Sequence, residues 1–169
     1  MNPTLSHWNE ASAGDALDAM MACCGSRRWA EAIVALRPIG SIQELSAAAD
    51  RVWSAMEEAD WLEAFACHPR IGGGRPADAS KQSAAWSRQE QASARDATKR
   101  VLGELEEGNL SYERRFGFTY IVCAAGKSAE EMLEILNRRK ASDRAAELGE
   151  AAEQQRQITQ IRLGKWLVE

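Results

Sequence analysis

The 169-residue chain has few of the features that mark nucleic-acid-binding, disulfide-rich or membrane proteins. Its formal net charge is −4, whereas a nucleic-acid-binding domain is expected to carry a basic stripe. Its four cysteines form no CxxC pair, so they indicate neither a zinc ribbon nor a disulfide framework. No apolar run approaches the roughly 20 residues of a membrane span. We therefore expect reduced thiols, a cytoplasmic location, and neither nucleic acid nor membrane as a partner.

Proline is also scarce, and residues that favour helices dominate the sequence. The pattern predicts an all-α fold: one domain over residues 1–169, built as a helical bundle of roughly eight to ten helices. Gly108-Asn109 is expected to break one helix, and Ser41 and Ser128 begin capping-box patterns. The helices that the pattern predicts span residues 12–24, 26–36, 41–56, 60–66, 80–106, 110–116, 128–140 and 142–167.

One segment differs from this helical pattern. Residues 118–123 have the composition of a β-strand, but no other segment of similar character could pair with them. We therefore expect a short extended or irregular buried segment, whose backbone amides could contact a ligand. The glycine-rich residues 71–79 are expected to form a loop, and they lack the spacing of a phosphate-binding P-loop.

His68 is the first candidate for chemistry, because it is one of only two histidines and precedes Pro69. A residue before proline is disfavoured in the α region, which places His68 where a helix ends and a loop begins. Its ordinary pKa, about 6.5, suits proton transfer near neutral pH. A helix-terminal histidine that caps carbonyl groups is the alternative. His7 has no partner at metal-ligand spacing, so no metal site is predicted.

Two further candidates lie on predicted helices. Ser87, Glu90 and Gln91 share one helix face, where they could hold a small ligand rich in N–H and C=O groups. Ser87 and Glu90 also fit a capping box, or a solvated polar face. Arg162 lies within an apolar stripe formed by Ala151, Ile158, Ile161 and Trp166, so its charge needs either a structural carboxylate or an anionic substrate.

Taken together, these segments resemble the 2-oxo-4-hydroxy-4-carboxy-5-ureidoimidazoline (OHCU) decarboxylase family of urate degradation. The resemblance covers nearly the whole chain, and the order of its short blocks makes it specific. One departure is local, because many members read HPDLAG where this chain has His68-Pro69-Arg70-Ile71-Gly72. The other blocks are Cys23–Ala30, Arg37-Pro38, Asp60–Phe65, Trp86–Gln91, Tyr112–Gly117, Gly126–Glu131 and Ile161–Leu163.

The resemblance implies an all-α, commonly dimeric enzyme that needs no cofactor. It implies that His68 and Glu90 are catalytic, and that Arg162 matches the family's arginine in the last helix. Contacts to the ureidoimidazoline substrate would come from Pro69, Ser87, Glu90 and Gln91, and from the segment Tyr120, Ile121, Val122, Cys123 and Ala124. The product would be (S)-allantoin. The rival hypotheses are a lyase or hydrolase acting on another ureido compound, and a helical interaction module without enzymatic activity.

Overall fold

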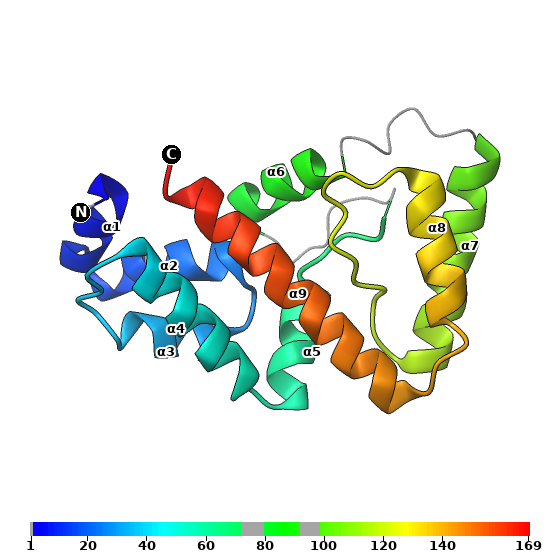
Figure 1. Ribbon diagram of the computed structural model, residues 1–169, viewed down its shortest axis with the longest axis horizontal. Coiled ribbons are helices and arrows are strands. Elements are labelled where there is room, and N and C mark those ends of the chain that lie inside the picture. The colour runs from blue at the N-terminus through cyan, green and yellow to red at the C-terminus, as the bar shows by residue number, and fades with distance from the viewer. Residues whose placement is uncertain (1, 72–79, 92–98) are drawn as a thin grey trace. The chain divides into compact units, whose positions relative to one another are not determined.

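A computed structural model describes residues 2–71, 80–91 and 99–169. Within these ranges the chain forms nine helices and no strand (Figure 1), which confirms the all-α prediction. None of the described helices is long and apolar enough to cross a membrane. The helices are α1 (Pro3–Glu10), α2 (Ala13–Cys23), α3 (Arg27–Val34), α4 (Ile42–Ser54), α5 (Glu58–Ala66), α6 (Lys81–Glu90), α7 (Lys99–Phe116), α8 (Ala129–Arg139) and α9 (Arg144–Trp166).

The chain divides into two compact units. The first comprises residues 1–64 and 156–169, and the second comprises residues 65–155. The single domain expected over residues 1–169 stays a prediction. In the first unit α2 contacts α3 and α3 contacts α4, around the fully buried Trp29, whose indole nitrogen donates to the carbonyl of Ala49 at 3.1 Å.

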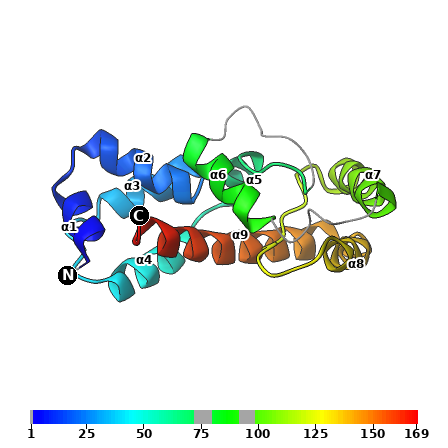
Figure 2. The same ribbon diagram turned by 90° about the horizontal axis from the view of Figure 1, so that it is seen from above.

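In the second unit α7 and α8 lie side by side and run in the same direction (Figures 1 and 2). The connection between parallel helices must return along their length before the second helix can start. Helix α8 has 11 residues and is about 16 Å long. A return connection in extended conformation needs about five residues to cover that length. Residues 118–124 have no regular secondary structure, and six of the seven are buried, as the sequence predicted.

Helix α7 corrects the expectation of a break at Gly108-Asn109, because it continues unbroken through both residues. A Cβ at Gly108 would lie 2.7 Å from Cδ2 of Leu136, so glycine here allows α8 to approach closely. Asn109 is fully buried, and its amide nitrogen donates to the carbonyl of Ile71 at 3.5 Å. Tertiary packing therefore overrides the local preference of both residues for a helix end.

Other helix boundaries also test the sequence patterns. The capping box at Ser128 and Glu131 is confirmed, with Glu131 accepting a hydrogen bond from the Ser128 amide. At the other site, Ser41 caps α4 as expected, but the Glu44 carboxylate accepts from the amide of Gly40 instead. The helix predicted over residues 80–106 ends at Glu90, where no helix-breaking residue signals the end. The glycine-rich loop expected at residues 71–79 lies outside the described residues from 72 onward, as do residues 92–98.

Helix α1 was missed by the sequence analysis. Asn2 caps it by accepting from the amide of Leu5 at 3.0 Å, and Pro3 occupies its first position. A capping side chain followed by proline is a recognised start signal. The pair Asn2-Pro3 could therefore have predicted α1.

The close approach of α7 and α8 predicts opposite effects for two glycines on α7. Gly108→Ala should lower the free energy of unfolding, because overpacking against buried Leu136 typically costs about 1–3 kcal/mol, more than the gain of about 1 kcal/mol in helix propensity. The matched control is Gly103→Ala, since a Cβ there meets nothing within 4 Å and the variant should be stabilised. Urea denaturation of both variants measures the difference, and equal stabilisation by both would contradict the packing argument.

Candidate active site

His68 follows α5 as predicted, and its side chain is half-buried. Its backbone amide donates to the carbonyl of Phe65 at 3.1 Å, which closes the last turn before Pro69. Its Nε2 atom lies 2.6 Å from Oε1 of Gln155, a fully buried residue of α9. The imidazole is therefore held from a helix that is 87 residues away in the sequence.

The second set of candidates lies at the end of α6. Ser87 is buried, whereas Glu90 and Gln91 are half-buried. The N-cap of this helix is Ser80, so Ser87 and Glu90 lie in its last turns and cannot form a capping box at its start. The capping alternative for Glu90 is thus wrong. Gln91 is the C-cap, and its amide donates to the carbonyl of Ser87 at 3.1 Å.

The extended segment supplies five candidates, Tyr120, Ile121, Val122, Cys123 and Ala124, and all five are buried. Side chains from the helices bind its backbone. Arg139 donates to the carbonyl of Ile121 at 2.6 Å, and Lys127 donates to that of Cys123 at 2.8 Å. The amide of Cys123 donates to Oε1 of Gln154 at 2.8 Å. Substrate contacts by this segment stay a prediction, with the Cys123 amide already bound to a protein acceptor.

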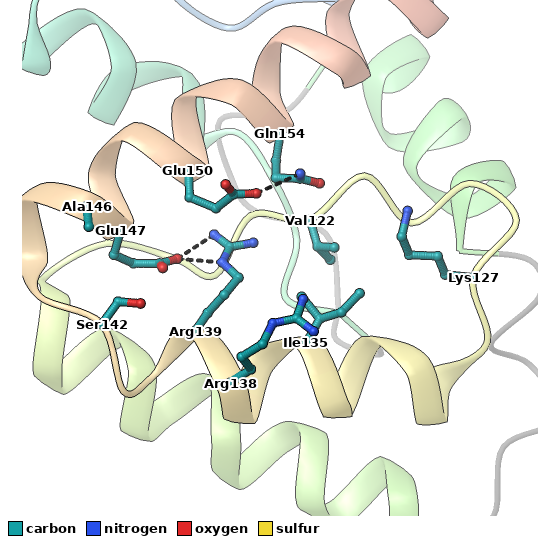
Figure 3. Close-up of a pocket in the computed structure, with 10 residues that line it drawn as sticks. All are labelled: Val122, Lys127, Ile135, Arg138, Arg139, Ser142, Ala146, Glu147, Glu150 and Gln154. Carbon is teal, nitrogen blue, oxygen red and sulfur yellow. Dashed lines mark hydrogen bonds and ion pairs between the residues drawn. The ribbon is translucent and has the colours of Figure 1, made fainter.

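A buried network of charged and phenolic side chains contacts the extended segment through Arg139. Arg139 and Glu147 form an ion pair, with Nε of Arg139 at 2.7 Å from Oε1 of Glu147 (Figure 3). The Tyr112 hydroxyl donates to the same oxygen, and both burial and this hydrogen bond raise the pKa of Tyr112. Burial also raises the pKa of Tyr120, whose ring lies 5.0 Å from the Arg139 guanidinium. Both phenols therefore stay neutral at physiological pH.

A cavity of about 540 Å³ opens between the segment, α8 and α9 (Figure 3). Among the predicted site residues only Val122 contributes to its described lining. The buried charges in its wall, Arg139 and Glu147, neutralise each other, and Glu150 accepts from Gln154 at 2.9 Å. These contacts indicate that the polar groups around the cavity hold the extended segment in place.

Arg162 is 2 % exposed and lies on α9 in the first unit. Ala151 and Ile158 of its predicted stripe are buried, whereas Ile161 and Trp166 are half-buried. Burial raises the pKa of Cys23, and the positive charge of Arg162 partly opposes this shift. The other candidates belong to the second unit.

Sequence reasoning missed four residues that organise the second unit: Arg139, Glu147, Gln154 and Gln155. Their local patterns resemble ordinary helix surface, so no signal in a single sequence marks them as buried. The described residues include no group of three or more His, Cys, Asp or Glu side chains that could hold a metal ion.

Comparison with known proteins decides the family. The sequence matches the OHCU decarboxylase family over residues 9–164. The chain belongs to the OHCU decarboxylase family. It is similar to a crystal structure of OHCU decarboxylase in the presence of (S)-allantoin, with a TM-score of 0.78 and 33% identity over 90% of this chain and 99% of that one. A crystal structure of (S)-allantoin synthase is 19% identical with a TM-score of 0.72, over 96% of this chain and 53% of that one, and shows the fold alone.

Curated relatives agree with this family. The chain is 36% identical to the uric acid degradation bifunctional protein TTL of Arabidopsis thaliana over 88% of its length, but it spans only 46% of that protein. It spans 28% of the bifunctional protein PucL of Bacillus subtilis, at 27% identity over 83% of this chain. The OHCU decarboxylase of Amia calva is 26% identical, over 79% of this chain and 77% of that protein.

The network behind the segment predicts a large loss of stability when Arg139 is removed. Arg139→Met leaves the buried Glu147 carboxylate without its cation, and breaking a buried pair in this way costs about 3–5 kcal/mol. The control is Arg100→Met, since Arg100 pairs with Glu104 on the exposed face of α7, and such pairs contribute about 0.3–0.5 kcal/mol. Chemical denaturation compares the two variants. Similar losses in both would show that the buried network does not stabilise the second unit.

Proposed function

We propose that this chain decarboxylates OHCU to (S)-allantoin in urate degradation. The observation that carries the proposal is the match to an OHCU decarboxylase structure across 99% of that chain, at 33% identity. The order of the sequence blocks around His68, Glu90 and Arg162 supports it. The two rival hypotheses, another ureido-compound enzyme and a helical interaction module, are not favoured by the family match.

The chemistry that we propose uses the substrate as its own electron sink. When the C–C bond to the carboxylate breaks, CO2 leaves and the electron pair remains on the ring carbon. OHCU carries an imine beside that carbon, and the imine can accept the pair without a cofactor. The protein then needs to orient the carboxylate out of the ring plane and to move protons. Proton delivery to one face of the ring would give (S)-allantoin and not the racemate.

In this proposal His68 acts as the general acid and base. Its place after α5, with Pro69 following and Gln155 holding Nε2, gives the imidazole a fixed position. It would deprotonate the substrate hydroxyl or protonate the ring nitrogen, and then help to deliver a proton to carbon.

The remaining candidates would bind the substrate. Glu90 and Gln91 would accept hydrogen bonds from its ureido and ring N–H groups through their side-chain oxygens, with Ser87 and Pro69 as further contacts. Backbone groups of residues 120–124 would contact its carbonyl groups, and Arg162 would bind its carboxylate in a bidentate manner.

The test generates OHCU in situ from urate, adds the protein, and follows the circular dichroism of the solution. We expect a signal from enantiopure allantoin to appear faster than in the spontaneous reaction, which yields racemate. The protein is first dialysed against a chelator, with no pyridoxal phosphate, thiamine or metal added. Unchanged activity is expected, whereas activity restored only by a divalent metal would favour the hydrolase rival. No acceleration at all would overturn the proposal.

We also propose a cytoplasmic homodimer. All four cysteines are free thiols, as suits a reducing compartment. The dimer is supported only by the resemblance to a family whose members are commonly dimeric.

His68→Asn tests the proposed acid and base. The variant should keep the fold, because the His68 side chain is only half-buried and follows the end of α5, and it should lose about 10²–10⁴-fold in turnover. Steady-state kinetics by the dichroism assay measure the loss, and far-ultraviolet dichroism checks the fold. A folded variant with a nearly normal rate would remove His68 from the mechanism.

Glu90→Gln tests substrate binding at α6. The variant replaces one carboxylate oxygen by an amide donor, which would face a substrate N–H group. A mispaired buried polar group costs about 1–3 kcal/mol, or about 5- to 150-fold in kcat/KM. Because Glu90 does not cap the start of α6, the melting temperature should change little. Gln89→Ala, on the exposed face of the same helix, is the control. If Glu90→Gln retained activity but had a lower melting temperature, Glu90 would have a structural role and not a substrate-binding one.

A further inference from the structure

Two adjacent glutamines of α9 each bind one element of the candidate site. Oε1 of Gln154 accepts a hydrogen bond from the backbone amide of Cys123 at 2.8 Å. Oε1 of Gln155 lies 2.6 Å from Nε2 of His68. Gln155 is fully buried, so its side chain has little freedom to leave this position. Neither glutamine lies in the family blocks that marked the sequence.

The contact with Gln155 selects a form of the imidazole. An amide oxygen accepts hydrogen bonds and cannot donate them, so Nε2 of His68 must carry the hydrogen in this contact. In the neutral ring, only one nitrogen carries a hydrogen. Nδ1 of His68 is then the basic nitrogen.

Resting on the proposed function, we infer that Gln155 is a positioning residue that fixes His68 as its Nε2–H tautomer and assigns proton exchange with the substrate to Nδ1. The hydrogen bond that one ring nitrogen makes sets the role of the other. Without the amide oxygen, the ring loses the acceptor that favours hydrogen on Nε2, and both tautomers become populated. Only the Nε2–H tautomer has its basic nitrogen at Nδ1.

The choice of glutamine also matters for the charge of the ring. A carboxylate in its place would accept the same hydrogen bond but would favour the imidazolium form, because an opposite charge stabilises it. The amide holds the ring in position without adding a negative charge. Gln155→Leu removes the acceptor at similar size, whereas Gln155→Glu keeps an acceptor.

The experiment reads the tautomer directly from the ¹⁵N NMR shifts of the imidazole nitrogens, above the pKa of the ring. The chain has only two histidines, so His7 serves as an internal reference and His68→Asn assigns the signals. The wild type should show hydrogen on Nε2 of His68. Gln155→Leu should show both tautomers, and Gln155→Glu should retain the wild-type tautomer. Gln157→Leu, two residues along α9, is the control and should match the wild type.

The same variants are assayed with OHCU. Misplacement of a reacting group costs up to about 100-fold, so kcat of Gln155→Leu should fall about 10- to 100-fold while KM changes little. A wild-type ring with hydrogen on Nδ1 would overturn the inference even if Gln155→Leu fails to fold. An unchanged tautomer in folded Gln155→Leu would also overturn it, whether or not kcat falls.

The two readouts separate this inference from the function on which it rests. A wild type that accelerates no OHCU decarboxylation, with the NMR spectra as expected, would refute the function and leave the hydrogen-bond assignment standing. An active wild type in which Gln155→Leu alters neither spectrum nor kcat would support the function and refute the role of Gln155.

Discussion

The second unit depends on a simple constraint: two neighbouring helices that run in the same direction need a long return connection. Residues 118–124 make this return without helical or strand hydrogen bonds, and most of them are buried. Buried backbone groups require partners. Side chains supply them here, since Arg139, Lys127 and Gln154 bind the carbonyls of Ile121 and Cys123 and the amide of Cys123.

This solution has an electrostatic cost that the protein offsets locally. Arg139 can donate to a buried carbonyl only if its charge is balanced, and Glu147 provides the balance. The Glu147 carboxylate in turn accepts a hydrogen bond from the Tyr112 hydroxyl. The ring centroid of Tyr112 lies 5.4 Å from that of Tyr120 and 5.8 Å from that of Phe118. Polar and aromatic contacts thus meet on the same extended segment.

The sequence predicted much of this arrangement, but only where the cause is local. Helix content, the Ser128 cap and the position of His68 follow from residue preferences over a few positions. The extended segment was predicted because a lone strand-like run cannot pair. The break at Gly108 was wrong because the reason for that glycine, the side chain of Leu136, comes from another helix. Gln155 was not predicted because its partner, His68, also comes from another part of the chain, and a single sequence does not show which distant residues are in contact.

The adjacency of Gln154 and Gln155 has a mechanical consequence. Consecutive residues on a helix point about 100° apart and share one backbone. Any rotation or shift of this turn of α9 must therefore move the support of His68 and the support of Cys123 together. The spacing of the two glutamines is set by the rise and rotation per residue of the helix. Either contact can therefore be altered on its own only by substituting its own glutamine. This turn of α9 therefore fixes the relative orientation of the contact with His68 and the contact with Cys123.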